Sequence, residues 1–105
     1  MEITQNNYGY DINFTVKKAD GTPENLSGIL GVKLQVADAD TFRNIVNGDC
    51  VIVSASLGQC KYTVQQNDFA KAGNFVGSLL IQYTPSKKLN TKTIFITVNK
   101  QMASS

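Results

Sequence analysis

The chain has 105 residues, of which 42% are hydrophobic and 17% charged, and its formal net charge is +2. This size suits one globular domain that buries its own core. Histidine is absent, which excludes Ser–His and Cys–His nucleophilic pairs and histidine-ligated metal sites. The charge excess is too small for a nucleic-acid-binding surface, and no apolar run approaches the ~18 residues of a membrane span. Segment 1–7 lacks the basic start and apolar core of a signal peptide, so we expect cytoplasmic synthesis.

Alternation of apolar and polar residues predicts short β-strands throughout the chain. Ile12, Phe14 and Val16 share one face of the first strand, and the turn sequence 19–23 ends it. The expected strands are 12–16, 32–36, 42–46, 50–54, 60–64, 74–83 and 94–98. Short strands with turns between them are typical of an antiparallel sandwich. We therefore predict an all-β, immunoglobulin-like antiparallel β-sandwich of about seven strands.

The connections between the strands follow from turn residues. Asn47-Gly48-Asp49 predicts a hairpin turn, because Asn-Gly tolerates positive φ, and Leu57-Gly58 predicts a two-residue turn. Segment 65–71 is the only expected helical turn. No repeat or linker interrupts the sequence, so we expect a polar N-terminal arm at 1–9, the sandwich at 10–100 and a C-terminal tail at 101–105.

The two cysteines flank one of these predicted turns. If Leu57-Gly58 forms the turn, Cys60 faces Ala55 rather than Cys50. A disulfide needs the turn centred on Ala55 instead, which places Gly58 inside a strand. Two buried thiols are the favoured interpretation and a bridge stays open. Their spacing and the lack of further ligands exclude a redox CxxC motif and a zinc site.

The side chains capable of chemistry form no recognisable catalytic or cofactor motif, and we expect no catalytic residues, no metal and no cofactor. Asp38 and Asp40 are a weak candidate for a calcium site, and turn formation explains them better. Tyr62 and Tyr83 fall on the apolar phase of their strands, which indicates core packing. The best candidates for an exposed contact surface are Asn6, Asn7, Tyr8 and Tyr10.

Several segments, in order along the chain, resemble a known family. The segment Asp20-Gly21-Thr22-Pro23, followed by Asn25-Leu26-Ser27-Gly28, resembles the "DGTPxDLTGA" start of immunoglobulin-like domains in phage tails. Segments 57–64 and 67–75 resemble the "xGxVxYTW" and "GDTxxAGxYxxEF" segments that follow in this family. The best-known member of the family that these segments resemble is the N-terminal domain of the phage baseplate upper protein, and the resemblance spans about residues 10–98.

Part of this resemblance is the corner before a strand that begins near Phe75. In immunoglobulin folds a tyrosine hydroxyl bonds back to the backbone here, and Phe75 has no hydroxyl. We expect Asp68 to cap the short turn and Gly73 to supply backbone freedom. The residues expected to determine the fold, rather than to form a site, are Gly21, Gly28, Gly58, Tyr62, Asp68, Gly73 and Phe75.

The resemblance implies a structural virion protein of a bacteriophage, a tail or baseplate component that acts through protein–protein assembly contacts and is not an enzyme. Its expected partners are other virion proteins, in a homo-oligomer or multi-copy assembly, without nucleic acid or membrane. Within the same class, a capsid-decoration or head-fibre base protein is the alternative. From another class, a carbohydrate-binding or adhesion module at the host surface is the alternative, and it requires an exposed aromatic cluster.

Overall fold

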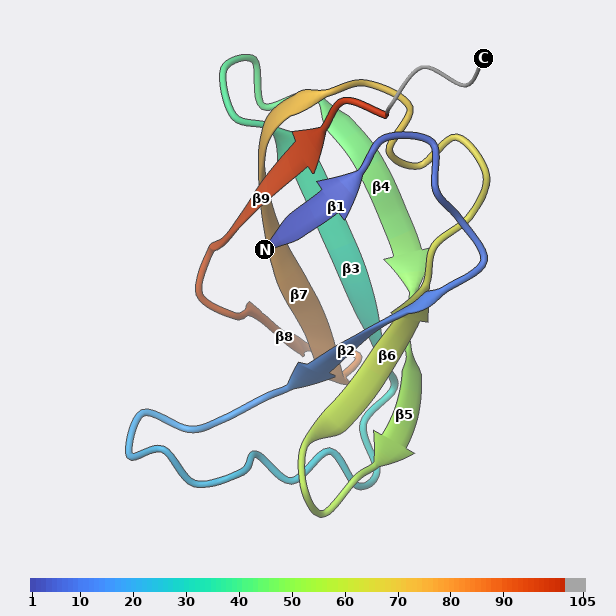
Figure 1. Ribbon diagram of the computed structural model, residues 1–105. Helices are drawn as coiled ribbons and strands as arrows, with labels where there is room; N and C mark the ends of the chain where they lie inside the picture. The colour runs from blue at the N-terminus through green and yellow to red at the C-terminus, as the bar shows by residue number, and fades with distance from the viewer. Residues whose placement is uncertain (102–105) are drawn as a thin grey trace.

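The computed structural model describes residues 1–101, which form a β-sandwich of two sheets (Figure 1). One sheet has the strand order β1-β9-β7-β3-β4, with β8 paired to β7, and the other has the order β2-β6-β5. The strands are β1 (Glu2–Thr4), β2 (Asp11–Thr15), β3 (Gly31–Asp38), β4 (Asn44–Asp49), β5 (Val51–Ser54), β6 (Gln59–Thr63), β7 (Gly73–Thr84), β8 (Lys87–Asn90) and β9 (Ile94–Asn99).

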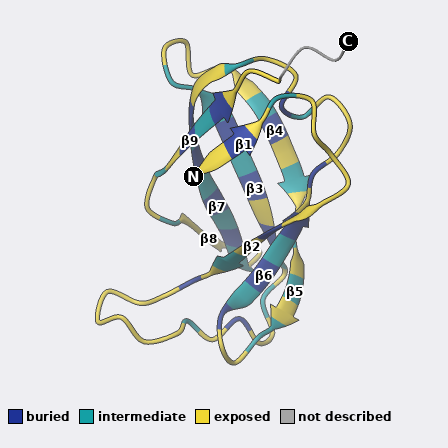
Figure 2. Ribbon diagram, viewed as in Figure 1, coloured by how far each residue is buried: buried dark blue, intermediate teal, exposed yellow. Residues whose placement is uncertain are grey.

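The core lies between the inner faces of the two sheets (Figure 2). In β3, Val32, Leu34 and Val36 are almost fully buried, whereas Lys33 is exposed on the other face. Period-2 alternation places these apolar side chains on one side of the pleat. The prediction of an all-β sandwich is therefore confirmed. Segment 65–71 forms turns rather than a helical turn, and among the described residues no helix is long and apolar enough to cross a membrane.

The hairpin predicted at Asn47-Gly48-Asp49 is wrong. These residues belong to β4, where Gly48 pairs with Leu34 of β3, and the chain then passes into the other sheet as β5. A Cβ atom on Gly48 would lie 2.5 Å from Cε1 of Tyr62. The glycine is needed because the buried ring of Tyr62 packs so close to this strand that no Cβ atom fits. The Asn-Gly turn pattern in the sequence does not reveal this role.

The turn between β5 and β6 is longer than predicted. Ser54 pairs with Gln59, so four residues connect the strands, and Ile52 pairs with Cys60 across a register shift. Cys50 and Cys60 are both free thiols, as the favoured interpretation expected, but only Cys60 is buried and Cys50 is partly exposed. Contact with the Cys60 thiol, together with burial, raises the pKa of Cys50.

The sequence pattern did not predict the short strands β1 and β8. Residues Glu2–Thr4, within the expected N-terminal arm, pair in parallel with Thr97–Asn99 of β9. Lys87 and Lys88, which the turn residues around Pro85 placed in a turn, begin β8, and Lys87–Asn90 pair with the end of β7. Of the expected C-terminal tail, Gln101 donates its backbone N–H to Oε1 of Gln5 at 3.3 Å, and residues 102–105 lie outside the described part.

Candidate functional site: a cleft at one end of the sandwich

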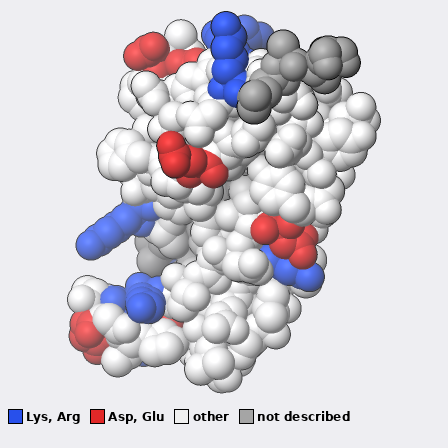
Figure 3. Space-filling view, in the orientation of Figure 1, with Lys and Arg blue, Asp and Glu red and all other residues white. Residues whose placement is uncertain are grey.

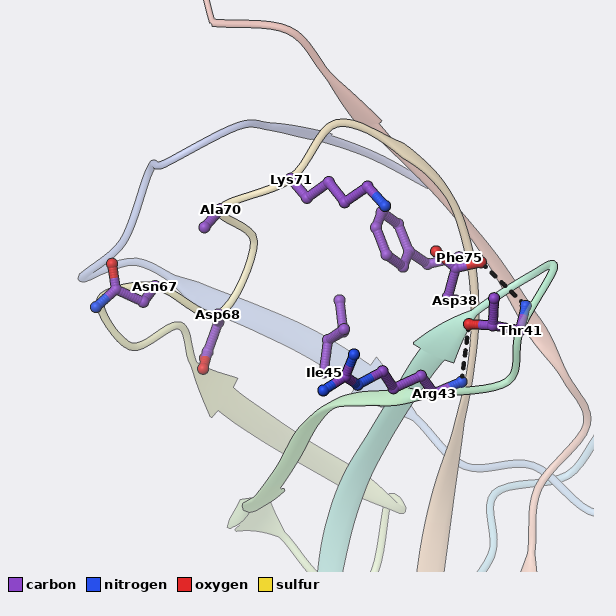
Figure 4. A pocket seen from close by; sticks show the side chains of 9 residues that line it. All are labelled: Asp38, Thr41, Arg43, Ile45, Asn67, Asp68, Ala70, Lys71 and Phe75. Atoms are coloured by element: carbon purple, nitrogen blue, oxygen red, sulfur yellow. Dashed lines mark hydrogen bonds between the residues drawn. The ribbon is translucent and has the colours of Figure 1, made fainter.

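Two loops at one end of the sandwich frame a cleft of about 650 Å³ (Figure 4). One loop connects β3 to β4, and the other follows β6 and leads into β7. The cleft is lined by Asp38, Thr41, Arg43, Ile45, Asn67, Asp68, Ala70, Lys71 and Phe75. Its two large apolar side chains, Ile45 and Phe75, come from strands and its charged lining comes mostly from the loops, so it combines an apolar floor with a polar rim.

The β3–β4 loop is held by the carboxylate of Asp38. Oδ1 of Asp38 accepts the backbone N–H groups of Asp40 at 2.8 Å and Thr41 at 3.2 Å. The backbone N–H of Phe42 donates to the carbonyl of Asp38 at 2.8 Å. These hydrogen bonds lower the pKa of Asp38, and the nearby charge of Lys71 lowers it further. Asp38 therefore stabilises the loop as an aspartate turn.

Phe42 occupies an unusual position in this loop. Its φ is +56°, in the left-handed region, and its side chain is 72% exposed. Bulky residues rarely adopt this conformation, which glycine and asparagine tolerate much better. The cleft-lining residues Thr41 and Arg43 lie on either side of it in the sequence. Figure 4 shows the Arg43 side chain extending toward Ile45 and that of Lys71 reaching toward Phe75 and Asp38.

The opposite loop is fixed by Asp68. Oδ2 of Asp68 accepts the Tyr62 hydroxyl at 2.5 Å and the backbone N–H of Gln65 at 2.8 Å. Burial, followed by this bond to Asp68, raises the pKa of Tyr62. Asn67 has a φ of +73°, which asparagine tolerates, and this conformation helps to turn the chain. One carboxylate thus links the loop to β6.

The predicted contact residues of the N-terminal segment lie along the outside of this second loop. The backbone N–H of Asn6 donates to the carbonyl of Phe69 at 2.9 Å, and that of Gly9 donates to Val64 at 2.8 Å. Asn6 and Asn7 are exposed, and Tyr8 and Tyr10 are 56% and 36% exposed. The structure therefore brings this segment to the loop that lines the cleft, although none of the predicted contact residues lines the cleft itself.

Comparison with known proteins agrees with this architecture. Residues 2–105 match the BppU N-terminal domain, the N-terminal domain of the baseplate upper protein. The chain belongs to this family. No curated protein matches the chain.

Membership of the family establishes the general class of the protein. Proteins of this family are structural components of bacteriophage baseplates, so the chain is a virion protein that associates with other virion proteins. The predicted family and the predicted location in the virion are confirmed. The capsid-decoration, head-fibre and carbohydrate-binding alternatives stay predictions.

The structure gives the geometry of the residues expected to determine the fold. Gly21, Gly28, Gly58 and Gly73 all have positive φ, and Phe75 is buried at the cleft floor. At Gly58, a Cβ atom would lie 2.5 Å from the carbonyl oxygen of Val16, so both the conformation and the space require glycine. Tyr62 and Asp68 are the two residues of this set that bond directly to each other.

Sequence reasoning missed the residues that give the cleft its character, Phe42, Arg43 and Lys71. The sequence pattern placed Phe42 and Arg43 at the start of a predicted strand. A positive φ at a bulky residue cannot be recognised from the sequence. Within residues 1–101, no group of three or more acidic or cysteine side chains is placed to hold a metal ion. Asp38, one of the weak calcium candidates, instead accepts hydrogen bonds from its own loop.

Proposed function

We propose that the chain is a structural baseplate subunit that docks against a neighbouring baseplate protein through Phe42 and the adjacent cleft. The observation that carries this proposal is the conformation of Phe42, which has a φ of +56° and is 72% exposed. A non-glycine residue in the left-handed region costs about 1–2 kcal/mol. In the isolated chain an exposed aromatic ring offsets little of that cost, whereas strained residues are concentrated at binding sites.

The surroundings of Phe42 suit a protein interface. Aromatic residues and arginine are enriched among the side chains that contribute most to binding, often at the centre of an apolar area with a polar rim. Phe42 and Arg43 are adjacent, and the cleft next to them has Ile45 and Phe75 in its floor and Lys71 at its edge. The exposed side chains of Tyr8 and Tyr10 extend the proposed contact area to the N-terminal segment.

This proposal assigns an assembly role without catalysis. The hydrogen-bonded loops hold Phe42 and the cleft in place before docking, which reduces the conformational entropy lost on association. We propose that the subunit is present in multiple copies, that it binds neither nucleic acid nor membrane and that it is not an enzyme. Its mechanism is the burial of a pre-positioned aromatic side chain against a partner protein.

The test is incorporation of variant chains into virions. Phage carrying Phe42→Asn are purified, and the amount of this chain per virion is measured by quantitative mass spectrometry against a tail protein. We expect a marked depletion, because loss of a central aromatic contact weakens binding by more than about tenfold. The matched control is Phe95→Thr, since Phe95 is 73% exposed but lies in β9 and does not line the cleft.

Two outcomes contradict the proposal. Virions of Phe42→Asn that carry the chain in the normal amount would show that this side chain is not a docking contact. A cryo-EM reconstruction of the tail in which only solvent surrounds Phe42 and the adjacent cleft in every copy would also contradict docking at this surface. Denaturant unfolding of the purified variant accompanies the experiment, so that depletion is not confused with misfolding.

A further inference from the structure

A second groove lies between the two sheets, beside β2. It has a volume of about 580 Å³ and is lined on one side by residues 14–19 and on the other by residues 89–92 and Ile94. Leu79, Ile81 and Tyr83 of β7 contribute further apolar lining. Phe75, in the floor of the first cleft, lies near the start of the same strand. The two sites therefore lie toward opposite ends of β7.

The edge of β2 that is not paired with β6 offers backbone hydrogen-bonding groups. In β2, Ile12 pairs with Tyr62 and Phe14 with Cys60, and the flanking N–H of Val16 donates to Gly58. In an antiparallel ladder, alternate residues point their backbone groups to opposite sides. The N–H and C=O groups of Asp11, Asn13 and Thr15 therefore point away from β6, at the unpaired edge of this sheet.

The groove has a basic rim. Three lysines, Lys17, Lys18 and Lys92, line it, against a single acidic residue, Glu24. Lys17 and Lys18 follow β2 rather than lie within it. Their side chains therefore do not cover the unpaired backbone groups of the strand. Figure 3 shows basic side chains on the left side of the molecule, above and below the gap between its upper and lower parts, with acidic side chains beside the lower ones.

We propose that this groove binds an extended acidic segment of a neighbouring baseplate protein, which adds to β2 as a further strand. Strand addition uses backbone hydrogen bonds for affinity and alternate side chains for specificity. Apolar side chains of the segment would contact Leu89 and Tyr83, and its carboxylates would face the lysines. The proposal rests on the assembly role proposed above, but it concerns a different surface and a different partner chemistry.

The charges favour a different protein over a second copy of this chain. The chain itself has a net charge of +2, which does not complement a basic rim. Among its edge strands, β5 (Val51–Ser54) contains no acidic residue and β1 and β4 contain one each, so none of these three offers a carboxylate to each of the three lysines. An acidic segment would form ion pairs with the lysines and backbone hydrogen bonds with the open edge of β2. A copy of β5 would form only the backbone hydrogen bonds.

The test uses the full chain and a fluorescent synthetic peptide of about six residues, the usual length of a strand, in which valine alternates with glutamate. Binding is measured by fluorescence anisotropy at low and high salt. We expect saturable binding that weakens at high salt, since the rim charges are exposed and screened. In NMR spectra, the amide exchange of Asn13 and Thr15 should slow when the peptide binds, because these amides gain acceptors.

Variants separate the charge from the strand edge. Replacing Lys17, Lys18 and Lys92 together by serine should weaken binding by about tenfold, as expected for three exposed charge pairs. Lys33→Ser is the matched control, because Lys33 lies on the outer face of the other sheet. Asn13→Pro removes one edge N–H without removing a bond to β6, and it should also abolish the slowed exchange at Thr15.

The remaining outcomes overturn the proposal. Equal binding of a peptide with lysine in place of glutamate would refute the acidic specificity. Equal binding of a peptide with N-methylated backbone would refute strand addition, as would unchanged exchange of Asn13 and Thr15. Dimerisation of the chain in analytical ultracentrifugation that blocks the peptide would assign the groove to a second copy. None of these results affects docking through Phe42, which the virion experiment tests separately.

Discussion

The hydroxyl of Tyr62 donates a hydrogen bond of 2.5 Å to Oδ2 of Asp68. The same oxygen accepts the backbone N–H of Gln65 at 2.8 Å. Tyr62 is 4% exposed, so its ring belongs to the core while its hydroxyl reaches the loop beside the cleft. This pair connects the sandwich core to one wall of the candidate site.

Removal of this hydroxyl should destabilise the protein. We expect Tyr62→Phe to lower the free energy of unfolding by about 1–2 kcal/mol, because a hydrogen bond to a charged group is lost while the ring stays. Urea denaturation measures the change. Tyr83→Phe is the control, since within residues 1–101 the Tyr83 hydroxyl makes no hydrogen bond and its removal should have little effect. Equal losses in the two variants would contradict the role of the bond.

The same pair predicts a dependence of stability on alkaline pH. Burial and the bond to Asp68 raise the pKa of Tyr62 above its ordinary value of 10.0. The folded state therefore holds this proton more tightly than the unfolded state, and the resulting stability is full below pH 10.0 and lost as the pH rises above it. The difference in free energy of unfolding between the native protein and Tyr62→Phe should shrink over this range. A constant difference would show that Tyr62 titrates alike in both states.

The close contact at Gly48 predicts a second loss of stability. In Gly48→Ala the added methyl would lie 2.5 Å from Cε1 and 3.0 Å from the hydroxyl of Tyr62. The ring cannot move away without disturbing its bond to Asp68, so we expect a loss of about 1–3 kcal/mol, as for other overpacked cores. Gly31→Ala is the matched control in β3, because nothing lies within 4 Å of its added methyl. Thermal unfolding of both variants provides the comparison.

Phe42 offers the opposite prediction, a gain in stability. Phe42→Asn should raise the free energy of unfolding by about 1 kcal/mol, because asparagine tolerates the left-handed conformation better than phenylalanine does. Phe42→Ala keeps a strained backbone and removes the ring, so it should show no such gain. If alanine and asparagine stabilise equally, the gain comes from loss of the exposed ring rather than from relief of the backbone.

Period-2 alternation made much of the fold predictable from the sequence. Val32, Leu34 and Val36 mark β3 clearly, because a half-buried strand needs one apolar face. Gly48 misled the prediction, since a glycine that makes room for an aromatic ring has the same signature as one that forms a turn. The strand β1 has three residues, too few for a pattern, and its pairing with β9 depends on tertiary structure.

The candidate site was less predictable than the fold. Its cleft brings residues of the β3–β4 loop next to Asp68 and Lys71, more than twenty positions away along the chain, and such proximity follows only from the topology. The positive φ of Phe42 cannot be inferred from its residue type. The groove beside β2 lies between the edge of the three-stranded sheet and β7, β8 and the start of β9 in the other sheet, an arrangement that turn and strand signals do not specify.

The pairing of the first strand with the last also determines how the domain bears mechanical load. Glu2 pairs with Thr97 and Thr4 with Asn99, so β1 and β9 run parallel as neighbours. Tension applied between the beginning of β1 and the end of β9 pulls these strands in opposite directions along their length. All hydrogen bonds between them then resist together in shear, instead of opening one after another. A domain connected in this way suits an assembly that must stay intact under strain.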